Sequence, residues 1–284
     1  MLLIHTGKVR DLYTNPDDPE HLYLVASDRL SAFDRQICDV PGKGQALTQI
    51  SAYWFRLLEK QGIPTHFKSL ENEQTMKVIK TTPIPLEFVV RGYLTGNTST
   101  SIWTHYAQGE RVYCGHALPD GMVRNQALAT PILTPTTKDT DHDQPVSRDD
   151  IVEKEKILTA ELYDALEDTC LKMFALGQEK AAKAGLILAD TKYEFGFDKG
   201  GKLMLIDEVH TPDSSRFWEA ASYQEAMAAR VDPKPLDKDM IRAYVKERCD
   251  PYNDPLPPIP SFLIDQTSHV YATFLGRLLS NAKD

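Results

Sequence analysis

One stretch, residues 186–218, constrains the fold of this chain most strongly. It reads LILADTKYEFGFDKGGKLMLIDEVHTPDSSRFW, and two apolar runs within it flank the glycine-bearing turn Asp198–Gly201. A turn of this composition between two apolar runs is typical of a β-hairpin. We therefore predict one strand from Leu186 to Phe197 and a returning strand from Lys202 to Val209.

Charged side chains gather on this hairpin. Because strand side chains alternate between two faces, Asp190, Lys192 and Glu194 point to the same face. Asp207 and Glu208 stand near the far end of the returning strand, and carboxylates this close repel one another unless a cation lies among them. One interpretation is a solvated face with a Lys–Glu cross-strand pair. The apolar flanks favour another, a divalent metal carried by a nucleoside triphosphate, with oxygen ligands from Glu194 and Asp207.

Composition excludes several classes of protein. The chain has 284 residues, enough for one large domain or two modest ones, and its 42% hydrophobic and 26% charged residues are ordinary for a globular protein. A net charge of −9 argues against nucleic acid or an anionic membrane as the main partner, but a local basic pocket still suits small anions. No apolar run approaches the length of a membrane span, and the first residues lack the features of a signal peptide.

The four cysteines are widely scattered and show no CxxC spacing. This pattern indicates reduced, mostly structural thiols in a cytoplasm-like compartment, with neither a zinc site nor a disulfide framework. The residues leave the oligomeric state open.

The first 84 residues predict a β-rich unit with one helix. Strands are expected over residues 2–5, 9–13, 22–27 and 75–80, and helical spacing over 46–60 places Trp54 in the core. Two basic residues beside a glycine in Gly7–Asp11 suit either phosphate groups or a plain turn, and the two interpretations are equally supported. Pro83 and Pro85 form a stiff crossing, so we place a domain boundary at residue 84.

The second unit, residues 85–284, opens on a strand over residues 86–91 that ends at Arg91. The loop after it has two glycines and several hydroxyl groups, which suits an anion; the alternative is Arg91 paired with Glu87 in the core. Residues 111–145 predict a long loop. Ser147 and Asp150 resemble a capping box that opens a helical region running to Gly185. Two further helices are expected over residues 238–248 and 267–279.

Several of these segments together resemble one family. They are Gly7–Asp11, Ile84–Arg91 with Thr95 and Gly96, Leu188–Gly196, Asp207–Glu208 and Pro212–Arg216. In this order, over nearly the whole chain, they are similar to the motifs of SAICAR synthetase, the phosphoribosylaminoimidazole-succinocarboxamide synthase family of de novo purine biosynthesis. One position departs: the family's first signature usually ends Gly-Ser, whereas Asn97 follows Gly96 here, with Ser99 and Ser101 close enough to substitute.

The resemblance implies an α+β fold related to ATP-grasp enzymes, in which a small β-rich N-terminal domain closes over ATP held on a larger mixed domain. It also implies a reaction: the carboxylate of carboxyaminoimidazole ribonucleotide (CAIR) is joined to the amino group of L-aspartate, and ATP becomes ADP and phosphate. A carboxylate is a poor acyl donor, so we expect the γ-phosphoryl group to pass to it first. The amine would then attack the resulting acyl phosphate. Phosphoryl transfer and amine attack both concentrate negative charge, which requires Mg²⁺ and fixed cations.

The resemblance further implies a role for each matching residue. Lys8 and Arg10 would cover the ATP phosphates, and the cofactor-binding set is Gly7, Lys8, Val9, Arg10, Glu87, Glu194 and Asp207, of which Glu194 and Asp207 would hold Mg²⁺. The substrate-binding set is Arg91, Asn97, Ser99, Asp213, Ser215 and Arg216. Lys192 and Lys138 would neutralise the reacting carboxylate or the aspartate. Asp190 would orient Lys192 or accept a hydrogen bond from a substrate amine.

Two other classes of function stay open. The same carboxylates and lysine would serve a small-molecule kinase, which transfers phosphoryl to a hydroxyl group. A non-catalytic nucleotide sensor ranks last, because it would be expected to have lost at least one of Lys8, Lys192, Glu194 and Asp207, all of which are present.

Overall fold

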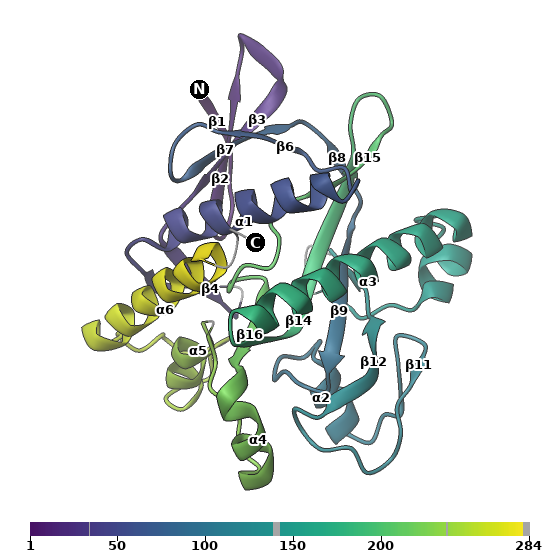
Figure 1. Cartoon of the computed structure of the whole chain (residues 1–284), viewed down its shortest axis with the longest axis vertical. Coiled ribbons are helices and arrows are strands. Elements are labelled where there is room, and N and C mark those ends of the chain that lie inside the picture. Colours follow the sequence, from purple (N-terminus) through teal and green to yellow (C-terminus); the bar gives the residue numbers. More distant parts are fainter. Residues whose placement is uncertain (34, 139–142, 237, 281–284) are drawn as a thin grey trace. The chain divides into compact units, whose positions relative to one another are not determined.

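The computed structural model describes residues 1–33, 35–138, 143–236 and 238–280 (Figure 1). It contains two compact units. The first comprises Met1–Thr82, Gly196–Ser214 and Pro235–Asp284, and the second comprises Pro83–Phe195 and Ser215–Lys234. This division differs from a single boundary at residue 84, because later segments of the chain return to the first unit. The helix α6 (Ser261–Ser280), for example, packs against α1 (Lys43–Lys60) (Figure 1).

The first unit is built on an antiparallel five-stranded sheet. Its order is β1 (Leu2–Thr6), β2 (Arg10–Asn15), β3 (Asp18–Ala26), β7 (Thr75–Ile79) and β6 (Phe67–Leu70). The four strands expected from the sequence are therefore confirmed, whereas β6 and the hairpin of β4 (Arg29–Ala32) and β5 (Arg35–Asp39) were not predicted. The helix α1 packs on β3, β6 and β7, and its Trp54 is 1% exposed, which confirms the predicted core position.

The remaining elements of the first unit come from the later parts of the chain. The turn Asp198–Gly201 is closed by the Asp198 carbonyl, which accepts from Gly201 N at 3.0 Å, and it leads into β15 (Leu203–Ile206). This strand is shorter than predicted because Asp207 adopts φ 66°, outside the β region. Both tail helices are confirmed as α5 (Asp239–Lys246) and α6. The latter begins six residues earlier than expected, directly after Pro260, which suits the first turn of a helix.

The second unit is organised around β14 (Leu186–Phe197), whose last two residues cross into the first unit. Within the second unit β14 pairs antiparallel with β9 (Leu86–Tyr93) on one side and with β16 (Ser215–Glu219) on the other. On its other edge β9 pairs with β12 (Ala127–Leu133) and β13 (Thr136–Thr137). Asp190 is the register partner of both Arg91 and Arg216, so one row of side chains crosses three strands.

The prediction of one long loop over residues 111–145 is wrong, because the described part of this segment contains four short strands. It contains β10 (Val112–Tyr113), β11 (His116–Ala117), β12 and β13, and α2 (Ile102–Ala107) precedes it. Pro131 hides β12 from a sequence pattern, because proline is unfavourable inside a sheet; β12 tolerates it as an edge strand with an irregular register. Residues 139–142 of the predicted loop lie outside the described residues.

The predicted helical region 147–185 is interrupted. Ser147 and Asp150 do form a reciprocal capping box, but it opens only the short π-helical segment η1 (Asp150–Lys154). The main helix α3 (Ala160–Lys183) has its own N-cap, Thr159, and Gly185 with φ 73° follows its end as expected. The helix α4 (Ala220–Ala229) was not predicted.

None of the helices that the structure describes is long and apolar enough to cross a membrane. Cys38, Cys114, Cys170 and Cys249 are free thiols.

Candidate active site

A cross-strand row of charges is the most prominent polar feature of the second unit. Arg216 Nη1 donates to Asp190 Oδ2, and Arg91 Nη1 lies 3.7 Å from the same oxygen. One carboxylate thus holds two guanidinium groups. The alternative of an Arg91–Glu87 pair is not what forms, since Glu87 receives Lys192 instead.

The surroundings of this row fix Arg91 in place. Its Nε donates to Thr134 Oγ1 at 2.8 Å and its Nη2 to the Thr100 carbonyl at 3.1 Å. Thr191 and Ser215 share a hydrogen bond of 2.7 Å on the neighbouring strands. The row thus brings together two guanidinium groups, whose planar N–H donors suit a phosphate or carboxylate ligand.

A second network in the same unit links two lysines and two glutamates. Lys192 Nζ donates to Glu87 Oε1 at 2.9 Å and to Glu194 Oε1 at 2.5 Å, and Lys138 Nζ donates to Glu194 Oε2 at 2.6 Å. Glu194 is only 6% exposed, so the solvated hairpin face is wrong. Burial opposes its ionisation, but the two lysines outweigh burial and lower the pKa of Glu194. The carboxylate is therefore ionised at neutral pH.

In the first unit the side chain of Arg10 contacts the segment that carries Asp207. Its Nη1 donates to Asp207 Oδ1 at 3.0 Å and its Nη2 to Glu208 Oε2 at 2.6 Å, while Thr211 Oγ1 also donates to Glu208. Arg10 is 5% exposed. Burial disfavours its charge, but Glu208 and Asp207 outweigh burial and raise the pKa of Arg10. The structure thus places Arg10 against two carboxylates, where sequence reasoning expected only a cover for phosphate groups.

The turn at Gly7 is closely packed. Gly7 N donates to the Arg10 carbonyl at 2.8 Å, and a Cβ at Gly7 would lie 2.7 Å from that oxygen, so only glycine fits. Arg29 Nη2 donates to the Gly7 carbonyl, and Ser31 Oγ donates to the carbonyl of Lys8. The loop is thereby held by its backbone, and the side chain of Lys8 is left exposed.

Asp213 lies in a buried cluster of the first unit. Its Oδ2 is 2.8 Å from Lys43 Nζ and 4.0 Å from Lys238 Nζ, and its Oδ1 accepts from the Tyr271 hydroxyl. Burial opposes the charge of Asp213, but Lys238 and Lys43 outweigh it and lower its pKa. Burial lowers the pKa of Lys238 to about 8. Sequence reasoning named only Asp213; a Lys in the Pro-Gly-Lys-Gly run at residues 41–44 is the one local signal that could have added Lys43.

Comparison with known proteins identifies the family of this chain. The family model described as SAICAR synthetase matches residues 3–259. The chain belongs to the SAICAR synthetase family.

Individual members of the family agree over almost the whole chain. A phosphoribosylaminoimidazole-succinocarboxamide synthase of Legionella pneumophila (strain Paris) is 46% identical over 261 residues, covering 92% of this chain and 82% of the relative. A SAICAR synthase from Saccharomyces cerevisiae, solved in complex with SAICAR, is 30% identical with a TM-score of 0.82, covering 98% and 94% of the two chains. A SAICAR synthetase in complex with ADP is 26% identical with a TM-score of 0.72, covering 97% of each. The expected α+β fold is confirmed.

The loop at which this member departs from the family signature is well ordered by its own hydrogen bonds. Gly96 has φ 100°, and Ser101 Oγ accepts from Thr98 N at 3.0 Å. Ser101 is therefore committed to the loop itself, whereas the side chains of Asn97 and Ser99 are exposed.

The donor set expected for Mg²⁺ in this family can be tested on the described residues. They contain no group of three or more His, Cys, Asp or Glu side chains that could hold a metal by themselves. Mg²⁺ does not need one, because it typically takes one or two carboxylates and completes its shell with phosphate oxygens and water. Glu194 of the second unit and Asp207 of the first are carboxylates of this kind, and each accepts hydrogen bonds from cationic side chains. Their chemistry fits Mg²⁺.

Proposed function

We propose that the chain is an ATP-dependent C–N ligase that joins CAIR and L-aspartate to form SAICAR, ADP and phosphate in de novo purine biosynthesis. The observation that carries this proposal is the family match over residues 3–259. Two solved relatives, one in complex with SAICAR and one in complex with ADP, support a nucleotide product and an adenine nucleotide as ligands. The small-molecule kinase is not favoured.

The cross-strand row is the proposed grip on the nucleotide substrate. Arg91 and Arg216 present two planar guanidinium groups, which match the two oxygens of a phosphate or carboxylate. The Asp190 carboxylate lies close to both arginines. We propose that it positions this pair rather than orienting Lys192. Ser215, hydrogen-bonded to Thr191, and the exposed Asn97 and Ser99 supply neutral contacts.

Lys192 and Lys138 are the proposed charge-neutralising groups. Both lysines donate hydrogen bonds to Glu194. An incoming substrate carboxylate therefore competes with Glu194 for ammonium groups that are already in place. A reacting carboxylate that accepts from Lys192 carries less negative charge and is a better target for the γ-phosphoryl group. The amine of aspartate then attacks the acyl phosphate, the new C–N bond forms, and phosphate leaves with one former carboxylate oxygen.

Mg²⁺ and ATP complete the proposal. Mg²⁺ would neutralise charge on the transferred phosphoryl group, and Glu194 and Asp207 are its proposed ligands. Lys8, whose side chain is exposed at the tight Gly7 turn, is the proposed cation for the ATP phosphates. Arg10 instead donates a hydrogen bond to Asp207 and holds that carboxylate in position. We keep a reducing, cytoplasm-like compartment as the predicted location, in keeping with the four free thiols.

The decisive assay measures ADP formation with CAIR and L-aspartate each omitted in turn. The proposal requires ADP only when both are present, whereas a kinase would release ADP without aspartate. The path is tested with CAIR labelled with ¹⁸O in its carboxylate, which should yield inorganic phosphate carrying one labelled oxygen per turnover. Unlabelled phosphate in a coupled, aspartate-dependent reaction would refute the acyl phosphate while leaving the ligase assignment intact.

A further inference from the structure

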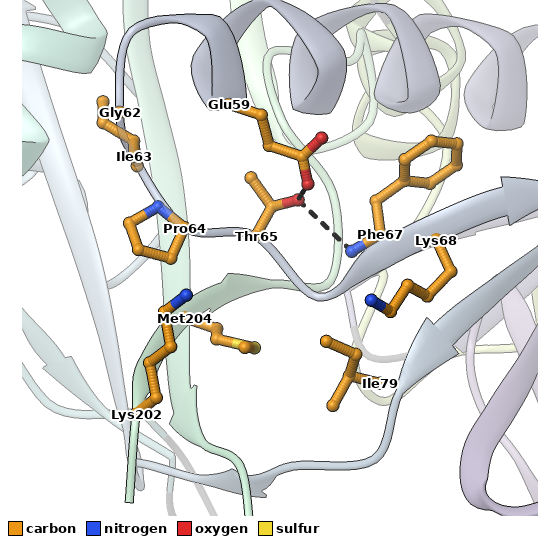
Figure 2. Close-up of a pocket in the computed structure, with 10 residues that line it drawn as sticks. All are labelled: Glu59, Gly62, Ile63, Pro64, Thr65, Phe67, Lys68, Ile79, Lys202 and Met204. Carbon is orange, nitrogen blue, oxygen red and sulfur yellow. Dashed lines mark hydrogen bonds between the residues drawn. The ribbon is translucent and has the colours of Figure 1, made fainter.

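A hollow of about 320 Å³ lies within the first unit, at the edge of its sheet (Figure 2). It is bounded by the C-terminal end of α1, the connection Gly62–Thr65, the edge strand β6, and residues of β7 and β15. Its lining shares no residue with the Gly7 turn, with Arg10 and its carboxylates, or with the Asp213 cluster. Neither the family signatures nor the proposed reaction uses it.

The lining combines an apolar surface with two cations. Ile63, Pro64, Phe67, Ile79 and Met204 form the apolar part. The side chains of Lys68 and Lys202 reach the hollow from two different sides (Figure 2). Among the described residues, neither ammonium group forms an ion pair or hydrogen bond with an acidic side chain; Asp198 accepts only from the backbone N of Lys202. Both lysines are exposed, so their ammonium groups are accessible to a ligand from solvent.

One carboxylate, that of Glu59, completes the charged lining. Its Oε1 accepts from Thr65 Oγ1 at 2.7 Å, and Thr65 Oγ1 in turn accepts from Phe67 N at 3.2 Å. The lining therefore carries two positive charges and one negative charge. A ligand that satisfies all three has an anionic group for the lysines and an N–H or O–H donor for Glu59.

The walls of the hollow are fixed by backbone pairing. The register between β6 and β7 shifts between Phe67 and Ser69, so Lys68 is the extra residue of a bulge, a device that re-aims a side chain at the edge of a sheet. On the opposite wall, Leu205 N donates to the Pro64 carbonyl and His66 N to the Leu205 carbonyl. These bonds hold β15 against the connection Gly62–Thr65. The hollow is thus formed before a ligand arrives, and its volume falls within the range of small-molecule sites.

We propose that this hollow is a second ligand site, which binds a small organic anion with an apolar body and an N–H or O–H donor. The anion lies between Lys68 and Lys202, the apolar body covers Ile79 and Met204, and the donor faces Glu59. Charge complementarity selects an anion over a neutral ligand of the same shape, because neither ammonium group is paired with a carboxylate among the described residues.

The test uses 8-anilinonaphthalene-1-sulfonate, which has a sulfonate, an apolar body and an N–H donor, with the full chain saturated by ADP and Mg²⁺. We expect saturable fluorescence at one site. Lys68→Gln and Lys202→Gln should each weaken binding about tenfold, the loss expected when one charged hydrogen bond disappears. Lys60→Gln is the matched control, since Lys60 is exposed on α1 outside the lining, and it should leave the affinity unchanged.

The neutral analogue N-phenyl-1-naphthylamine provides the second arm. It should bind at least tenfold more weakly to the wild-type chain and should be insensitive to both lysine substitutions. Sulfonate binding that both lysine variants retain, or that is seen only when ADP is omitted, would overturn the proposal, because the probe would then occupy another site. Ligase activity is measured separately on the same variants and should be unchanged, so a failure of this site is distinguishable from a failure of the proposed reaction.

Discussion

Lys238→Met should stabilise the protein at neutral pH, although it removes a charged partner of Asp213. Lys238 is 9% exposed and lies 4.0 Å from Asp213 Oδ2, which also receives Lys43 at 2.8 Å. The charged groups facing Lys238 are Asp213 and Glu208, which favour its protonation, and Arg242 and Lys43, which oppose it. Two buried ammonium groups share one carboxylate, so the second is poorly compensated for its lost hydration.

The expected magnitude follows from the pKa. Burial lowers the pKa of Lys238 from 10.5 to about 8, and 2.5 pH units at 1.36 kcal/mol each correspond to about 3 kcal/mol. Below pH 8 both the folded and the unfolded chain hold this proton, so the folded state carries the whole cost. Between pH 8 and 10.5 only the unfolded chain holds it, and wild-type stability therefore rises with pH. Methionine keeps most of the apolar stem, so the variant should be more stable by about 1–3 kcal/mol at pH 7.

The assay is urea unfolding of the wild type and the variant at pH 7, 8, 9 and 10. The difference between the two free energies of unfolding should be largest at pH 7 and should shrink steadily above pH 8. Lys199→Met is the control, because the Lys199 side chain is 78% exposed and an exposed lysine contributes little to the free energy of unfolding. A Lys238→Met variant that is less stable at pH 7, or whose difference from wild type is independent of pH, would refute this reasoning.

Three further predictions concern the proposed reaction. Glu194→Gln and Asp207→Asn should each abolish turnover while circular dichroism stays unchanged, since losing a metal ligand costs several kcal/mol in the transition state; near-normal activity at saturating Mg²⁺ removes that residue from the site. Arg216→Lys should weaken CAIR binding by roughly 1.5–3 kcal/mol in calorimetry and leave ATP affinity unchanged, because lysine lacks the planar fork; the reverse pattern means the pockets are exchanged. Asn97→Ser should be nearly neutral and Asn97→Ala should raise the CAIR KM modestly, whereas a larger effect of Ser99→Ala would place the contact at Ser99.

Local patterns in the sequence predicted the elements whose signal lies within the element itself. Period-two alternation identified β14 and its charged face, 3.6-residue spacing identified α1 with Trp54 in the core, and Gly185 marked the end of α3. The family motifs identified the reaction, because they are long and occur in a fixed order. Where Pro131 masks the alternation of an edge strand, the same reasoning missed β12.

The partners of the charged side chains were decided only by the tertiary structure. Alternation predicted that Asp190 and Glu194 share one face of the strand. The register of β14 against β9 and β16 places two arginines beside Asp190. Lys138, 56 residues away in the sequence, donates to Glu194. Arg10 found Glu208 across 198 residues of sequence. A sequence pattern shows how each segment buries its apolar face. Which charged side chains then meet depends on pairing between distant segments. Because these side chains are buried, their partners determine whether they are ionised and what role they can have.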